Sequence, residues 1–166
     1  MREEEFVTAR EKKCSFFGFL FRLATFAVAV YGAVTAAKKI LTRLSRRLEE
    51  DNEGNESKRY LVGLGMREIC LEDEDVSDVD LTVVVGNAEL DLCEAELAEE
   101  TFVKVRTLGG KVLIKVPPMV RVELDGKGVI CGFSNQVPSY ENKSLPVVYV
   151  NAESLGACLK IVLGEE

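Results

Sequence analysis

The sequence predicts an all-β protein, a β-solenoid with repeats of about 23 residues that follows a single N-terminal α-helix. Apolar and polar residues alternate from Leu81 onward, which is the period of a β-strand. Glycines recur in this half of the chain at spacings of 24, 22 and 24 residues, at Gly86, Gly110, Gly132 and Gly156. A repeat of about 20–50 residues is typical of a stacked, solenoid-like architecture.

The front of the chain differs in charge and hydropathy. Residues 1–48 carry ten Lys and Arg against four Asp and Glu, whereas residues 49–166 carry eleven against twenty-four. A charged tail at 1–15 precedes the apolar run 16–37, whose one charge is Arg22. A helix of that length rises about 33 Å, which matches a bilayer hydrocarbon core of about 30 Å. We expect a transmembrane helix at 16–37, in preference to an interfacial helix or a cleaved signal peptide.

Residues 38–50 keep a helical period, with apolar residues three and four positions apart and basic residues on the other face. This predicts a juxtamembrane amphipathic helix, so that membrane lipid contacts residues 16–48; a solvated continuation of the span is the alternative. The C-terminal flank of the span has one more basic residue than the N-terminal flank, which favours a single-pass cell-membrane protein with a cytoplasmic C-terminal domain. Cys14, beside the span, is a candidate for reversible acylation.

Residues 51–79 are predicted to form an acidic linker and entry segment ahead of a solenoid domain at 80–166. The stretch DNEGNESKR at 51–59 has the composition of a flexible linker. The run LEDEDVSDVD at 71–80 is expected to be a solvated approach to the first strand, because its like charges repel one another. Its carboxylates do not make a Ca²⁺ loop, since the central Gly and the terminal bidentate Glu are lacking.

The solenoid interpretation follows from how such repeats bury apolar residues. One coil cannot bury its inward row alone, so each repeat is expected to stack on the next along the chain. Glycine suits the corners, where a positive φ or a close backbone approach is needed. The pair Pro117-Pro118 lacks two backbone donors and therefore predicts a corner between strands. A small β-sandwich is the alternative fold.

Composition excludes many kinds of active site. The chain has no His, so imidazole bases and His-ligated metals are excluded, and without a CxxC motif we do not expect a structural zinc site. The five cysteines are expected to be reduced, mostly as small core residues. Glu89 and Asp91 share the solvent face of one strand, but no aromatic stacking platform is near them in the sequence. An acidic domain also repels nucleic acid. We expect no catalytic, cofactor or metal site, and therefore no enzyme.

The strand-forming half resembles a known family. The matching positions are Gly109-Gly110 with Val112 and Ile114, Val116-Pro117, Val120 and Val122 before Gly126, Cys131-Gly132, and Gly156-Ala157. On these positions residues 80–164 resemble the C-terminal domain of LiaF-like, cell wall-active antibiotics response proteins of bacteria. The glycine doublet of the family is incomplete at Cys131-Gly132 and at Gly156-Ala157. The resemblance implies a β-solenoid-like fold and a part in envelope-stress signalling, where membrane-anchored members restrain a sensor kinase.

Together these observations predict a membrane-anchored, non-enzymatic accessory or regulatory protein of envelope-stress signalling, whose solenoid contacts an unknown protein partner, such as a membrane sensor kinase. The alternative is a bactofilin-like scaffold that polymerises at the membrane through the ends of its solenoid.

Overall fold

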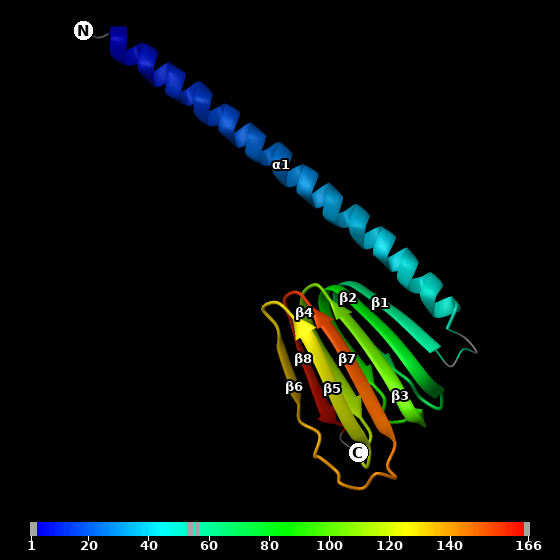
Figure 1. Ribbon diagram of the computed structural model, residues 1–166. Helices are drawn as coiled ribbons and strands as arrows, with labels where there is room; N and C mark the ends of the chain where they lie inside the picture. The colour runs from blue at the N-terminus through cyan, green and yellow to red at the C-terminus, as the bar shows by residue number, and fades with distance from the viewer. Residues whose placement is uncertain (1–2, 53–54, 56, 165–166) are drawn as a thin grey trace. The chain divides into compact units, whose positions relative to one another are not determined.

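The computed structural model describes the backbone of residues 3–52, 55 and 57–164, and the side chains of residues 26–52, 55 and 57–164. It consists of one helix and eight strands, which form two compact units, Met1–Ile40 and Leu41–Glu166 (Figure 1). The elements in chain order are α1 (Glu3–Glu50), β1 (Ser57–Cys70), β2 (Asp75–Asp91), β3 (Glu96–Thr107), β4 (Gly110–Val116), β5 (Arg121–Gly128), β6 (Gly132–Asn135), β7 (Val147–Ser154) and β8 (Ala157–Leu163).

The first unit is helical. In the part of α1 whose side chains are described, no stretch is long and apolar enough to cross a membrane. The predicted span at 16–37 falls partly on residues 16–25, whose side chains lie outside that part, as do those of Cys14 and the charged tail. Large apolar side chains that follow are exposed, among them Phe26, Val28 and Tyr31.

The second unit is a β-solenoid of about four turns, as the sequence predicted. Each rung has two arms, and all strand pairs are parallel. We call the first arms layer A: residues 57–64 of β1 and 75–83 of β2, with β3, β7 and β5. The second arms form layer B: residues 65–70 of β1 and 86–91 of β2, with β4, β8 and β6.

The bend between the two arms is visible in the burial pattern. In β2 the buried positions are odd-numbered from Val79 to Val83, after a register shift that follows Val76, and even-numbered from Ala88, so the two arms turn opposite backbone faces toward one shared core. The bends stack glycine on glycine, with Gly65, Gly86 and Gly110 in register. A Cβ atom on Gly110 would collide with the backbone oxygen of Gly86, and the φ of Gly110 is +118°. Only glycine fits this corner.

The rungs do not stack in chain order, contrary to the expectation from the repeats. β3 pairs with β7 and β4 pairs with β8, while β5 and β6 pair only with β7 and β8. The C-terminal rung β7–β8 therefore lies between β3–β4 and β5–β6. The connection after β4, residues 117–120, includes the predicted Pro117-Pro118 corner. It skips one position in the stack, and the rung β7–β8 later occupies that position. The longer connection 136–146 returns the chain, and Figure 1 shows it as the loop that joins β6 to β7.

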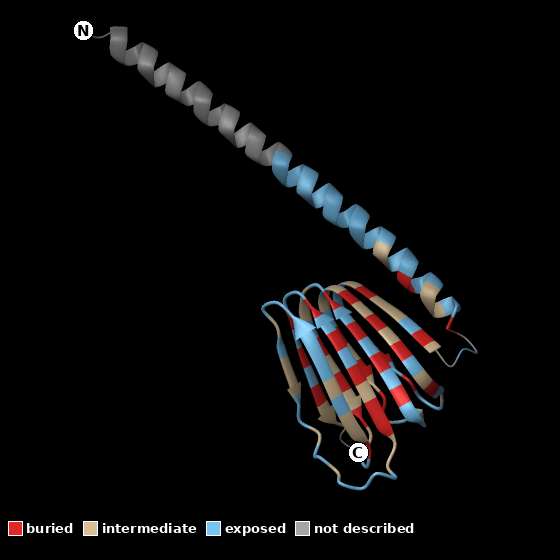
Figure 2. Ribbon diagram, in the orientation of Figure 1, coloured by how far each residue is buried: buried red, intermediate tan, exposed pale blue. Residues whose placement is uncertain are grey.

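The solenoid begins earlier than predicted. β1 starts at Ser57, inside the predicted linker 51–79, and its Val62 and Ile69 are buried in the core. The acidic run is likewise part of the first rungs, since Val76 and Val79 of β2 are buried. The core is a column of Val, Leu and Ile between the layers, and Figure 2 shows buried and less buried positions alternating along the strands.

Candidate interaction surface

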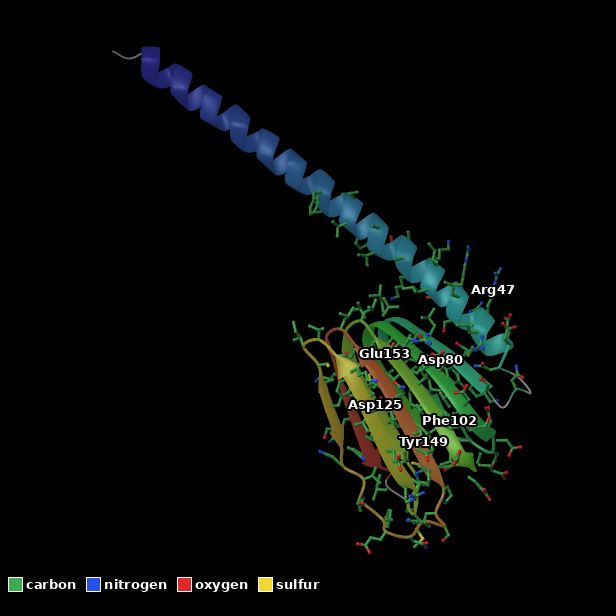
Figure 3. The ribbon with its side chains drawn as sticks, viewed as in Figure 1. Arg47, Asp80, Phe102, Asp125, Tyr149 and Glu153 are labelled. Atoms are coloured by element: carbon green, nitrogen blue, oxygen red, sulfur yellow. The ribbon has the colours of Figure 1, made fainter. Side chains whose placement is uncertain are left out.

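The outer face of layer A carries aromatic and charged side chains in ordered rows. Asp78, Phe102, Tyr149 and Glu123 lie in register on four neighbouring strands, and we call them the aromatic row. The next row, two residues further along each strand, is formed by Asp80, Lys104, Asn151 and Asp125. Figure 3 shows Phe102 and Tyr149 close together, with Asp80 and Asp125 on either side of them.

Phe102 and Tyr149 form a stacked pair. Their ring centroids are 5.3 Å apart and the ring planes differ by 15°. Each ring is held by its strand, because Val103 beside Phe102 and Val150 beside Tyr149 point inward and are buried. Phe102 nevertheless remains 49% exposed. A pair of aromatic rings at the surface, held in place by a rigid sheet, is typical of the centre of a binding interface.

A shallow cavity of about 470 Å³ surrounds this pair. Three carboxylates and one ammonium group line it, from Asp78, Glu123, Asp125 and Lys104, together with the Asn151 amide and the two rings. Asp125 forms an exposed ion pair with Lys127, with Nζ and Oδ2 3.1 Å apart. The cavity therefore combines an apolar floor with a polar rim of negative balance.

The outer face of layer B is different. The two carboxylates singled out from the sequence, Glu89 and Asp91, both contact Lys115, whose Nζ is 2.6 Å from Glu89 Oε1 and 3.6 Å from Asp91 Oδ2. Burial acts to raise the pKa of Asp91, but hydrogen bonds from Cys93 and the nearby Lys115 outweigh it and hold the pKa below its ordinary value. Two carboxylates that bind the same lysine are not arranged as an acid–base pair.

The four cysteines whose side chains the structure describes are not core residues, so the prediction that most cysteines lie in the core is wrong. Cys70 and Cys158 are exposed, and Cys93 and Cys131 are half-buried; all four are free thiols. Burial raises the pKa of the Cys93 thiol to about 11, with the neighbouring Asp91 carboxylate adding to the effect. Such a thiol is a poor nucleophile near neutral pH. Among the described residues, no group of three or more Cys, Asp and Glu side chains is arranged to hold a metal ion.

A larger cavity, of about 750 Å³, lies at the β1 end of the solenoid. Its charged groups bind one another: Lys58 Nζ lies 2.7 Å from Glu74 Oε2, and Arg67 Nη1 lies 2.6 Å from Glu49 Oε1. Lys58 is buried and also donates to the backbone oxygen of Asn52 at 3.2 Å. We interpret this cavity as the polar closure of the first rung, because both cations that line it, Lys58 and Arg67, already bind carboxylates of the protein.

Sequence reasoning missed the aromatic pair, although a signal was present. The segments LGGKVLIKV and LGACLKIVL align with Leu108 on Leu155. Extending that alignment six residues toward the N-terminus places Phe102 on Tyr149, both just before a core valine. The missing information was the rung order, since only the insertion of β7 next to β3 makes the two aligned positions neighbours.

Comparison with protein-family models, with curated proteins and with solved structures found no match to this chain.

Proposed function

We propose that this protein is a non-enzymatic interaction module, a β-solenoid that binds a partner protein through the outer face of layer A. The observation that carries the proposal is the stacked pair of Phe102 and Tyr149, half-exposed on a rigid sheet and surrounded by charged side chains. Aromatic residues at the centre of a polar rim contribute much of the binding energy in protein interfaces. The lysine on layer B and the two cations at the β1 end already bind neighbouring carboxylates.

The N-terminal unit provides a means of anchoring. The apolar run 16–37 and the basic residues that flank it support attachment of the solenoid to a membrane, with a cytoplasmic C-terminal domain. The resemblance of residues 80–164 to LiaF-like proteins supports a regulatory role in envelope-stress signalling, with a membrane sensor kinase as the kind of partner. Full-length protein is then expected in the membrane fraction after an alkaline wash. Recovery in the soluble fraction would exclude the anchor.

The interaction face is tested by site-specific photo-crosslinking in cells that contain the full chain. A photoreactive phenylalanine analogue replaces Tyr149 in one variant and Met66 in a control variant. Met66 is 74% exposed on the outer face of layer B, so both positions are accessible. We expect a discrete crosslinked product from position 149 that is lost when Phe102→Ser is added, and none from position 66. Equal products from both positions would contradict the proposal.

The alternative is a bactofilin-like scaffold that polymerises end to end. Its support is the unpaired outer edge of β5 and β6 at one end of the solenoid. A filament needs two complementary ends, however, and the β1 end is in contact with the last turns of α1 through Arg67. Light scattering from the full chain in detergent separates the two functions, because a scaffold grows with protein concentration and an interaction module does not.

A further inference from the structure

The interaction face contains a site for one chemical group. Because Phe102 covers one face of the Tyr149 ring, the other face of that ring is directed away from β3, toward β5. Glu123 of β5 is the register partner of Tyr149 on that side, and Asp125 follows two residues later. Tyr149 and both carboxylates line the same cavity, together with the Asn151 amide.

This combination selects a cation. The face of an aromatic ring attracts positive charge through its quadrupole, and a carboxylate beside it adds a direct electrostatic attraction. Three carboxylates and one ammonium group line the cavity, and Lys127 beside it pairs with Asp125, so the charge around the cavity stays negative. A neutral ligand such as a sugar would cover the rings but would leave the excess negative charge uncompensated.

Arginine fits this space better than lysine. Its planar guanidinium group stacks flat on a ring while its N–H groups donate to a carboxylate, whereas the ammonium group of lysine is a strongly hydrated point charge. The cavity opens onto the sheet surface beside β5, the outermost strand of layer A, so a side chain reaches it from an extended segment lying on the sheet.

We propose that the cavity between Tyr149 and Glu123 binds an arginine side chain from an extended segment of the partner protein. This inference rests on the proposed function, because it names the chemistry of the partner at the same face. It assigns Tyr149 as the stacking platform, Phe102 as the ring that orients it, and Glu123 as the carboxylate that receives the guanidinium group.

The probe is a fluorescent, capped hexapeptide of alternating arginine and glycine, and its control contains citrulline in place of arginine. Citrulline keeps the planar shape but has no charge. Binding to the full-length protein in neutral detergent is measured by fluorescence anisotropy at fixed ionic strength. We expect the arginine peptide to bind more tightly than the citrulline peptide by about tenfold or more, since the electrostatic attraction is lost.

Substitutions with uncharged residues distinguish binding at this site from a general attraction between the cationic peptide and an acidic protein. Tyr149→Ser is expected to weaken binding about three- to tenfold, whereas Tyr149→Phe keeps the ring and stays within about twofold. Glu123→Gln is expected to weaken binding about fivefold. Its matched control is Glu68→Gln, which removes an exposed carboxylate from layer B and changes the affinity less than about twofold. Thermal unfolding of each variant checks that the fold is retained.

Equal effects of Glu123→Gln and Glu68→Gln, with none from Tyr149→Ser, would overturn the inference. Binding of a neutral oligosaccharide that depends on Tyr149, in place of the arginine peptide, would overturn it too. If crosslinking at position 149 needs Phe102 but is unaffected by Glu123→Gln, the proposed function stands and the arginine site fails. If the peptide binds as expected but no partner is crosslinked, the proposed function fails instead.

Discussion

The two ends of the solenoid are closed in different ways. At the β1 end the inward positions include polar side chains, Lys58, Tyr60 and Arg67, in register with the buried apolar positions of β2. Arg67 contacts Ser45 and Glu49 in the last turns of α1, and Asn52 hydrogen-bonds both to the backbone N–H of Arg59 and to its carbonyl oxygen. Burial raises the pKa of Tyr60 to about 12. A polar helix end therefore terminates the stack.

At the opposite end the last rung is closed by its own side chains. The inward residues of β5, Val122 and Leu124, are only half-buried, whereas Val148 and Val150 beside them on β7 are fully buried. The Phe133 ring lies against Gly126, inside the same rung. Among the described strands none pairs with the outer edge of β5, and its solvent face carries charged residues at every outward position from Arg121 to Lys127, which discourages pairing with another edge.

This difference shows that capping and stacking order are separate properties of the solenoid. The β1 end is held by contacts from outside the strands, so it stays closed whichever rung follows. The β5–β6 end depends on a rung that comes later in the chain. Stability at that end should therefore respond to changes in β7–β8, and stability at the β1 end to changes in α1.

The largest expected effect comes from deleting residues 147–166. This deletion removes β7–β8, the strand partners of β5 and β6, so the remaining β5–β6 rung should lose its amide protection in hydrogen exchange. The matched control deletes residues 121–146, which joins Val120 directly to β7 and leaves the remaining rungs stacked in order. We expect this control to unfold cooperatively although it lacks more residues. The opposite ranking would show that the rungs stack in chain order.

A pair of glycine substitutions compares how tightly each end is packed. A Cβ atom added at Gly63 would lie 2.7 Å from a side-chain carbon of Leu41, and one added at Gly126 would lie 2.7 Å from a ring carbon of Phe133. The contact at Gly63 is with the Cβ atom of Leu41, so the helix backbone itself must move, whereas the Phe133 ring can rotate away. We expect Gly63→Ala to lower the free energy of unfolding by about 2 kcal/mol and Gly126→Ala by about 1 kcal/mol. Chemical denaturation measures both values, and an equal or larger loss at Gly126 would contradict this comparison.

Arg67→Met tests the polar closure of the β1 end. The substitution removes the ion pair with Glu49 and the hydrogen bond to Ser45, but it keeps much of the aliphatic stem. Because both charged side chains are about one-third exposed, solvent screens the pair, and we expect a loss of about 0.5–1 kcal/mol in the free energy of unfolding. Lys127→Met, which removes the exposed pair with Asp125 at the other end, is the control and should cost less. A larger loss from the control would show that the β1 end is not held by its polar contacts.

The smallest expected effect is the part of the pH dependence of stability that comes from Glu49 at the β1 end. The hydrogen bond from Arg67 holds the pKa of Glu49 below its ordinary value of 4.5, against an opposing effect of burial. A lowered pKa in the folded state stabilises the protein above pH 4.5, and that contribution is lost as the pH falls through the folded-state pKa. Thermal unfolding between neutral and acidic pH should show a component that disappears in Arg67→Met. An identical acid profile for that variant would rule out this linkage.

Much of the solenoid could be predicted from local patterns. The alternation in residues such as Val103 and Val105 predicts strands, and the spacing from Gly86 to Gly110 predicts the stacked corners. The first rung was missed because its inward positions include Lys58 and Arg67, which interrupt the apolar alternation. The signal that would have revealed it is Gly65, which lies 21 residues before Gly86 and continues the glycine series.

The candidate interaction surface could not be predicted in the same way. If β5 rather than β7 lay next to β3, Glu123 would be the residue expected beside Phe102. Tyr149 would then lie one rung further away. The neighbours of each strand therefore decide whether two aromatic side chains form a pair or stay apart. That choice depends on contacts between segments 47 residues apart, which no local pattern contains.

The sequence by itself determined the strand period, the corner glycines and the apolar character of the inward rows, because each depends on a residue's own backbone and side chain. Only the tertiary structure decided the order of the rungs, since every rung presents a similar inward row and several orders bury it. With that order came the pairing of Phe102 with Tyr149 and the cavity beside β5. The closure of the β1 end was also a tertiary result, because it needs α1 and β1 to meet.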